Sequence, residues 1–205
     1  MKIKICGLFR TQDAEYIDEL LPDFAGFVFY PKSHRFTDDD TAFKLRQKIN
    51  PIVKTVGVFV DDAAKHIEKL YKKGTINIIQ LHGHESDEYI KNLRQRLPDA
   101  EIWQAFVIRD ENDLIRAETS SADKVLLDNG YGTGKCFDWS LIKDFKRDFI
   151  LAGGITPENI NEAAEKFSPW AIDVSSGVET EKIKDKEKIN SVIAEIRRLG
   201  SERNV

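Results

Sequence analysis

The residues best suited to acid–base chemistry end two short apolar runs. Cys6 closes the run in "KIKICGL" (2–8), and Asp128 closes "KVLLD" (124–128). A thiolate is a competent base or nucleophile, and the ammonium of Lys4 would favour it over the thiol. An acid placed after two leucines is costly to bury unless it is satisfied or used, so Asp128 is a candidate proton donor with a raised pKa. The alternatives are that Cys6 is a small core residue and that Asp128 caps a turn.

Two glycine-rich segments are candidates for binding a phosphate group. They are "AGGIT" (152–156) and "SSGVE" (175–179). Backbone N–H groups of such loops can hold a phosphate, and glycine lets the backbone approach closely. Either segment alone is weak evidence, because turns also need glycine. The residues that we expect at this phosphate site are Gly153, Gly154, Ser176 and Gly177.

Arginine and histidine side chains in two further loops allow more than one interpretation. Arg35 in "YPKSHRF" offers a planar fork for a carboxylate or phosphate, or it is a solvated loop cation. His82 and His84 in "HGHE" resemble a metal cluster, but a turn separates them and the chain has four histidines in all. We therefore expect no metal, and we expect His82 to be structural or to touch a substrate.

Strand-like apolar runs alternate with helical segments along the chain, as in a parallel α/β protein. Eight such strands can close into a barrel, which removes both sheet edges. The predicted fold is a (β/α)8 TIM barrel that forms a single domain over residues 1–205. An open doubly wound sheet is the alternative, weakened because no G-x-G-x-x-G motif follows the first strand. The eight runs cover residues 3–8, 24–30, 53–60, 76–83, 102–108, 124–128, 149–154 and 171–177.

Helix signals lie between these runs. Thr11 and Thr156 are predicted N-caps, with Pro157 at the first helical position after Thr156. The segment 61–74 carries apolar residues at helical spacing and stops at Gly74. Further helical segments are expected to begin in "TDDDT" (37–41), to cover "DKEKINSVIAEIRRLG" (185–200) and to be short in "DWSLIKDFKRD" (138–148).

Side-chain alternation decides which residues face the interior of such a barrel. Successive side chains of a strand point to opposite faces, so Lys4 and Cys6 share the inner face while Ile3 and Ile5 face the helices. In these barrels the chemistry gathers at the carboxyl ends of the strands. We therefore expect polar groups from four strands to converge on one mouth. The same alternation pairs Gln80 with His82, Leu126 with Asp128, and Asp173 with Ser175.

Composition narrows the class of partner and the compartment. The net charge of −4 gives no basic balance for nucleic acid or an anionic membrane. No apolar run approaches the roughly 18 residues that span a bilayer. The chain begins with a strand-like segment and has two cysteines, which favours a reducing cytoplasm. A Cys6–Cys136 disulfide is the less favoured alternative.

The motifs taken together resemble phosphoribosylanthranilate isomerase. They match this family in order and spacing from residue 2 to residue 179, with His34 and Cys136 standing where proline and threonine are common. The resemblance implies the isomerase step of tryptophan biosynthesis, with no metal and no organic cofactor. The matching motifs are "KICGL", "GFVFYPKSHR", "VGVFV", "QLHG", "LLDNGYGTGKCFDW", "LAGGITPENI" and "DVSSGVE".

The family's residue roles can be carried over to matching positions. Its cysteine base falls on Cys6, its aspartic general acid on Asp128, and its arginine for the anthranilate carboxylate on Arg35. Its phosphate loops fall on the two glycine segments named above. Asp173 could hold a ribose hydroxyl, or it could be the structural partner of a barrel cation. The expected partner is one small phosphorylated substrate, and the chain is expected to be a monomer or homodimer.

Rival functions remain open from the sequence. Another sugar-phosphate isomerase would use carboxylate or lysine pairs at other strand ends and would leave Cys6 idle. A non-catalytic phosphate binder would have no reason to keep Cys6, Arg35 and Asp128 together. A redox sensor built on Cys6 is the third alternative. Acceptance of the related substrate of histidine biosynthesis is also left open.

Overall fold

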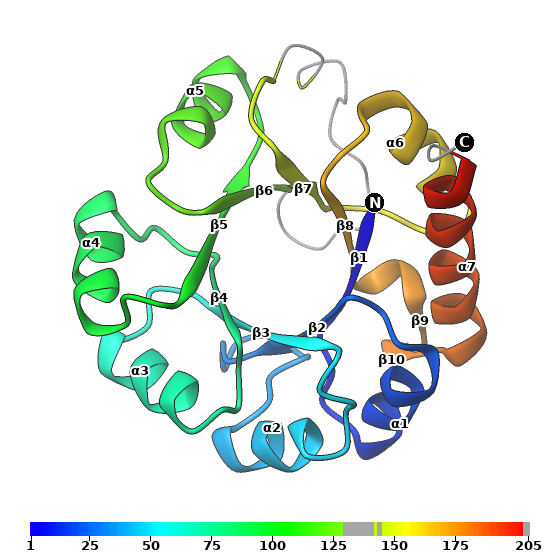
Figure 1. Ribbon diagram of the computed structural model, residues 1–205, viewed down its shortest axis with the longest axis horizontal. Coiled ribbons are helices and arrows are strands. Elements are labelled where there is room, and N and C mark those ends of the chain that lie inside the picture. The colour runs from blue at the N-terminus through cyan, green and yellow to red at the C-terminus, as the bar shows by residue number, and fades with distance from the viewer. Residues whose placement is uncertain (129–141, 143–144, 203–205) are drawn as a thin grey trace.

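The computed structural model describes residues 1–128, 142 and 145–202. Eight parallel strands form a closed barrel in which each strand pairs with its neighbours in sequence, and β8 pairs with β1 (Figure 1). The predicted barrel is thus confirmed. The strands are β1 (Lys2–Cys6), β2 (Phe24–Val28), β3 (Lys54–Phe59), β4 (Ile78–Leu81), β5 (Glu101–Val107), β6 (Lys124–Asp128), β7 (Phe149–Leu151) and β8 (Ala171–Val174).

Helices surround the barrel on its outside (Figure 1). None of the helices in the described ranges is long and apolar enough to cross a membrane. After β8 the chain forms one turn of 3-10 helix, η2 (Ser176–Val178), and an antiparallel ribbon of β9 (Glu179–Thr180) and β10 (Ile183–Lys184). The helices are α1 (Thr11–Leu20), α2 (Asp39–Arg46), α3 (Ala64–Lys72), α4 (Asp87–Arg96), α5 (Glu111–Thr119), α6 (Ile160–Phe167) and α7 (Lys186–Glu202).

The predicted alternation of side chains is confirmed. Ile3 and Ile5 belong to the large apolar core between the strands and the helices. A second, smaller core fills the barrel itself and includes Leu126. Isoleucine and valine side chains suit both faces because a parallel strand is covered on both sides. The inner core consists of Phe24, Val56, Ile78, Trp103, Ala105, Leu126, Ile150, Ala152 and Ala171.

Two predicted N-caps are wrong, whereas the helix expected in "TDDDT" is confirmed. α1 is preceded by Arg10 as N-cap, and Thr11 is already helical. α6 begins at Ile160 with Asn159 as N-cap, although the Thr156 hydroxyl accepts from the Glu158 N–H at 3.3 Å in the turn before the helix. The Asn159 side chain closes the same turn: its Oδ1 accepts from the Thr156 N–H at 2.8 Å and its Nδ2 donates to the Gly154 carbonyl at 2.8 Å. In the confirmed helix, the N-cap carboxylate accepts from two backbone N–H groups of the first turn of α2. Most of the segment 138–148 lies outside the described residues.

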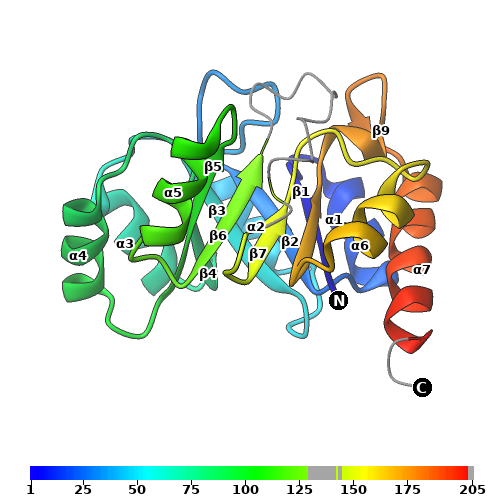
Figure 2. The same ribbon diagram turned by 90° about the horizontal axis from the view of Figure 1, so that it is seen from above.

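The barrel has two different ends. We call the end where the strands finish the mouth, and the opposite end the floor. The β2–α2 loop and the β9–β10 ribbon both lie at the mouth, and the N-terminus lies at the floor (Figure 2). Three rings, which we call the floor cluster, pack near the floor: Phe24, Trp103 and Trp170, with centroids 5.1 to 5.9 Å apart. Catalytic groups in such barrels come from the mouth.

Candidate active site

Cys6 lies at the mouth beside a buried ion pair. Lys4 is wholly buried, and its Nζ lies 2.7 Å from Oδ2 of Asp173. Across on β2, Gly26 makes room for both side chains, since a Cβ there would lie 2.7 Å from the Cys6 Sγ and 3.2 Å from the Lys4 Cε. The Ser175 hydroxyl donates to the Cys6 carbonyl at 3.0 Å and so ties the end of β8 to β1. Cys6 is a free thiol in the structure, and Cys136, its alternative partner, lies outside the described residues.

The protonation expected for Cys6 differs from the prediction. Burial raises the pKa of the Cys6 thiol, and the opposing pull of Lys4 is too weak to reverse that shift because Asp173 acts against it. Burial alone would lower the pKa of Lys4, but Asp173 and Cys6 outweigh burial and raise it. Lys4 therefore favours the thiolate as the sequence suggested, but burial outweighs it and the pKa of Cys6 lies above its ordinary value.

Asp173 has one satisfied and one unsatisfied oxygen. Its Oδ2 accepts from Lys4, so the interpretation as partner of a barrel cation is confirmed. Its Oδ1 is buried and has no hydrogen-bond partner among the described residues. A buried carboxylate oxygen without a donor is energetically unfavourable, and such orphans require an explanation such as an unseen ligand.

Asp128 and His82 meet across the mouth, as the predicted convergence requires. The His82 Nε2 lies 3.3 Å from Oδ2 of Asp128. Behind His82, the Gln80 amide Nε2 lies 3.0 Å from the other ring nitrogen, Nδ1. Gln80 is buried, and its Oε1 has no hydrogen-bond partner in the described part of the chain. Three polar groups from β4 and β6 thus form one chain of contacts.

The histidines of "HGHE" do not form a metal site in the described residues. His84 turns away to the Asp61 carboxylate at 3.1 Å and is almost fully exposed. Glu85 is used by the backbone, accepting from the N–H groups of Asp61 and Gly83, both at 2.8 Å. No group of three or more metal-ligating side chains occurs in the described ranges.

Arg35 is not a solvated loop cation. Its Nε and Nη2 donate to the two carboxylate oxygens of Glu179 at 2.7 and 2.8 Å, and its side chain is only 15% exposed. Gly7, with a φ of +84°, lies beneath it, because a Cβ there would be 2.3 Å from the Arg35 Cδ. Arg35 therefore lies directly beside the end of β1 that carries Cys6.

Glu179 and Lys184 are members of the mouth that the sequence interpretation missed. The Lys184 Nζ, fully buried, donates to Glu179 Oε1 at 2.7 Å and to the Ser175 carbonyl at 2.9 Å. Burial would raise the pKa of Glu179, but Arg35 and Lys184 together lower it to about 2. The only sequence signal was the acid that ends "SSGVE", since its cationic partners are far away or on a later strand.

The two glycine segments meet at the mouth. Gly153 and Gly154 have φ values of +84° and +70°, a conformation that suits glycine. Gly177 packs against the other loop so closely that a Cβ there would lie 1.9 Å from the Ile155 carbonyl oxygen. Ser176 begins the turn of 3-10 helix that contains Gly177. The predicted pairing of these two loops is therefore present, whereas the loop "NGYGTGK" and Cys136 lie outside the described residues.

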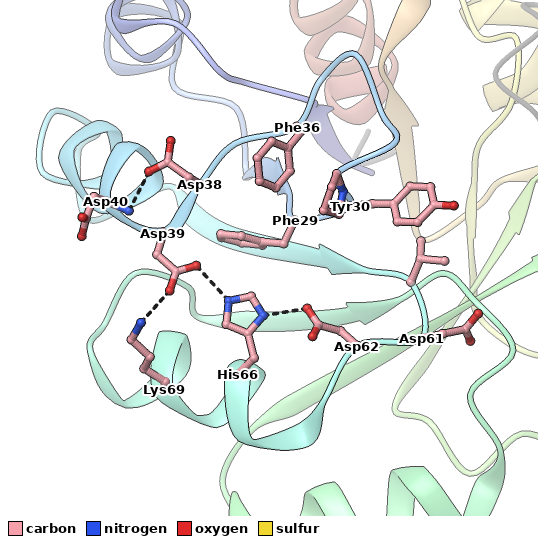
Figure 3. Close-up of a pocket in the computed structure, with 12 residues that line it drawn as sticks. Phe29, Tyr30, Phe36, Asp38, Asp39, Asp40, Asp61, Asp62, His66 and Lys69 are labelled. Carbon is pink, nitrogen blue, oxygen red and sulfur yellow. Dashed lines mark hydrogen bonds and ion pairs between the residues drawn. The ribbon is translucent and has the colours of Figure 1, made fainter.

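A separate hollow of about 580 Å³ lies between the β2–α2 and β3–α3 connections (Figure 3). His66 bridges two carboxylates there, with Nε2 at 2.8 Å from Asp39 and Nδ1 at 2.7 Å from Asp62. Lys69 adds a contact to Asp39 at 2.7 Å. Burial lowers the pKa of His66, but the two carboxylates outweigh it and raise the pKa. None of the predicted site residues lines this hollow. Its ion pairs connect α3 to the start of α2.

Comparison with known proteins shows the family of the chain. The family model for N-(5′-phosphoribosyl)anthranilate (PRA) isomerase matches residues 3–195. An N-(5′-phosphoribosyl)anthranilate isomerase of Endomicrobium trichonymphae is 39% identical over 203 residues, covering 97% of this chain and 99% of that protein.

Solved structures of such isomerases share the fold. One, in complex with reduced 1-(o-carboxyphenylamino)-1-deoxyribulose 5-phosphate, superposes with a TM-score of 0.85 at 35% identity and covers 97% of this chain and 99% of that chain. A structure of monomers of the dimeric isomerase of Thermotoga maritima gives the same values. The chain therefore belongs to the N-(5′-phosphoribosyl)anthranilate isomerase family.

Proposed function

We propose that this isomerase of tryptophan biosynthesis rearranges N-(5-phosphoribosyl)anthranilate with Cys6 as general base and Asp128 as general acid. The product is 1-(2-carboxyphenylamino)-1-deoxyribulose 5-phosphate. The observation that supports this most is the presence, at one mouth, of a thiol, a carboxyl group, an arginine and two glycine loops. An aldose-to-ketose rearrangement of an anionic substrate needs these groups: two for proton transfer and the others for binding.

The first step opens the ribose ring. Asp128 donates a proton to the ring oxygen, the C1–O bond breaks, and the anilino nitrogen supplies the electron pair that forms the iminium. His82 and Gln80 form a chain of contacts behind Asp128, with the His82 Nε2 at 3.3 Å from the Asp128 Oδ2 and the Gln80 Nε2 at 3.0 Å from the His82 Nδ1. These contacts would fix the orientation of the Asp128 carboxyl group toward the substrate.

The second step removes the proton from C2. The iminium makes this C–H acidic, and the Cys6 thiolate takes the proton to give an enolamine, which tautomerises to the ketone. Because burial raises the pKa of the Cys6 thiol, only a fraction of the enzyme carries the thiolate near neutral pH. Lys4 offsets part of this cost as the nearest cation. The rate should therefore depend on how much thiolate is present.

The remaining groups bind the substrate. We assign the phosphate to Gly153, Gly154, Ser176 and Gly177, whose loops pack together just after β7 and β8. The orphaned Oδ1 of Asp173 would accept a hydrogen bond from a ribose hydroxyl, and Arg35 would bind the anthranilate carboxylate. His82, which lies 3.3 Å from Asp128, would also touch the substrate. No metal or organic cofactor takes part in this scheme. The single domain, the cytoplasmic location and the monomeric or homodimeric state remain predictions.

A coupled fluorescence assay tests this function. The labile substrate is made in situ from anthranilate and phosphoribosyl pyrophosphate by a purified transferase, and the protein is then added. Rapid conversion to the aminoketose by the wild type, and not by Cys6→Ser, is the expected result. Absence of conversion by the wild type while the phosphorylated substrate still binds would overturn the proposal and favour a binding protein.

A further inference from the structure

Two buried charged side chains, Glu179 and Lys184, hold Arg35 from behind. Glu179, on β9, binds the Nε and Nη2 atoms of Arg35 side-on and is itself only 5% exposed. Lys184, on β10, binds the same carboxylate and the end of β8 through the Ser175 carbonyl. Lys188 adds a contact at the start of α7, donating to the Glu179 backbone carbonyl at 2.8 Å. The carboxylate is thus fastened by its side chain and its backbone.

This contact leaves a defined part of the guanidinium available. A guanidinium has five N–H donors arranged along its edges. Glu179 occupies the edge formed by Nε and Nη2, so the end edge, formed by Nη1 and the second hydrogen of Nη2, is left for another planar anion. The aliphatic part of Arg35 cannot shift toward β1 because it already touches Gly7. The direction of the end edge is therefore set by Glu179 and by Gly7.

The side chains of Arg35, Glu179 and Lys184 together carry the one positive charge that a bound carboxylate would balance. Glu179 stays ionised because its pKa lies near 2. Burial lowers the pKa of Lys184, and Glu179 acts against that shift. When Lys184 and Arg35 are both protonated, the net charge of these two side chains and Glu179 is +1. His34, whose Nε2 is 3.8 Å from Glu179, has its pKa lowered by burial and by Arg35, so it adds no charge near neutral pH.

We propose that Glu179, supported by Lys184, is a positioning residue that aims the end edge of Arg35 at the anthranilate carboxylate. The β9–β10 ribbon then decides the preference for a carboxylated arylamine over an uncarboxylated one. This inference rests on the proposed function. It assigns a task to two buried residues that take no part in the proton transfers, and it makes an opposite prediction from simple charge attraction.

The test compares two stable ligands in three proteins. The ligands are reduced 1-(2-carboxyphenylamino)-1-deoxyribulose 5-phosphate and the same compound without the ring carboxylate. The proteins are the wild type, Glu179→Gln, and Thr180→Ala as a control on the same ribbon. Thr180 is exposed, and its hydroxyl donates to the Asp185 Oδ2 at 2.7 Å. Dissociation constants are measured by calorimetry, and folding is checked by thermal melting.

The ratio of the two dissociation constants is the decisive quantity. We expect the wild type and Thr180→Ala to prefer the carboxylated ligand on the order of 10- to 100-fold, as a charge-assisted bidentate contact allows. In Glu179→Gln this ratio should fall by about tenfold, and KM for the substrate should rise with little change in kcat. General loosening of the fold would weaken both ligands equally and leave the ratio unchanged.

Other outcomes would overturn the inference. The Gln variant removes the negative charge beside Arg35, so an unchanged or larger ratio would mean that charge, not direction, governs binding. If the wild type binds both ligands equally, Arg35 does not read the carboxylate. If the wild type binds neither ligand, the proposed function itself fails. Should Glu179→Gln not fold, Glu179→Asp keeps the charge, shortens the side chain by one methylene, and should lower the ratio as well.

Discussion

The floor and the mouth of the barrel bury their residues in different ways, and two lysines of β1 show the contrast. Lys2 at the floor is exposed and lies over the rings of Phe24 and Trp170, with its Nζ at 5.5 and 4.9 Å from their centroids. Lys4, two residues on and on the same face, is wholly buried against the Asp173 carboxylate. The floor closes the barrel with apolar area, whereas the mouth is filled with paired charges.

This contrast separates stability from activity. Burial of aromatic area stabilises the fold, and each buried charge at the mouth carries a desolvation cost that its partner only partly offsets. Natural proteins keep such unfavourable groups where function needs them. Substitutions at the floor should therefore change the free energy of unfolding, and substitutions at the mouth should change kinetics first.

The largest effect is expected from the two proton-transfer residues. Cys6→Ser and Asp128→Asn should each lower kcat by about 100- to 10,000-fold, the usual contribution of a general acid or base, with modest changes in KM. Both variants should melt close to the wild type because volume and packing are nearly kept. Steady-state kinetics and thermal melting check this, and a near-wild-type kcat in either variant would remove that residue from its role.

Substitutions at the floor should lower stability and leave the kinetics of the folded enzyme nearly unchanged. Trp103→Ala removes the centre of the floor cluster and should lower the free energy of unfolding by about 3–5 kcal/mol, while KM of the surviving folded enzyme changes little. Denaturant unfolding measures the loss. Ile52→Ala is the control, since that side chain is 71% exposed and its truncation should cost no more than about 0.5 kcal/mol. A large KM change in Trp103→Ala would mean that the two ends are coupled.

Replacing the buried Lys4–Asp173 ion pair tests whether apolar side chains at the mouth would make the fold equally stable. Lys4→Met leaves the buried Asp173 without its cation and should cost about 3 kcal/mol. The double variant Lys4→Met with Asp173→Leu should recover most of that loss and stay inactive. Denaturant unfolding of the wild type and the two variants measures the loss and its recovery. A double variant as unstable as the single one would show that the pair itself stabilises the barrel.

The raised pKa of the Cys6 thiol predicts the pH dependence of catalysis. Below that pKa, kcat/KM should rise with pH by up to about tenfold per unit, because the thiolate fraction rises at that rate. Profiles between about pH 6 and 9 measure the effect. In Lys4→Met, which lacks the cation that favours the thiolate, the rise should move to higher pH. A flat wild-type profile would contradict a thiolate base.

The smallest expected effect lies at His66, in the hollow between the β2–α2 and β3–α3 connections. Its pKa is raised in the folded chain, so its contribution to stability is fully present below the unfolded value of about 6.5 and is lost as pH rises through the folded value. His66→Gln should therefore cost no more than about 1 kcal/mol at pH 6 and nearly nothing at pH 9. Unfolding at the two pH values checks the sign. An equal loss at both would show that charge is not involved.

Much of the fold and of the mouth could be predicted from the chain alone. The alternation of eight apolar runs with helical segments indicated a closed barrel, and the period of two placed Lys4, Cys6 and Asp173 inside it. Both inferences depend on local pattern, which sequence carries directly. The glycine segments at 152–156 and 175–179 were identified for the same reason, because the backbone conformations they need are local.

The tertiary structure alone decided which charges meet and how they are protonated. Arg35 and Glu179 are 144 residues apart, so only closure of the barrel brings them within 2.8 Å. The pKa of Cys6 depends on how fully water is excluded and on whether Asp173 competes for Lys4. Neither can be inferred from the segment 2–8 alone. Residue type and local pattern were enough to identify most side chains of this site. Their environment depends on packing around the whole barrel, because burial and long-range pairing exist only in the folded chain.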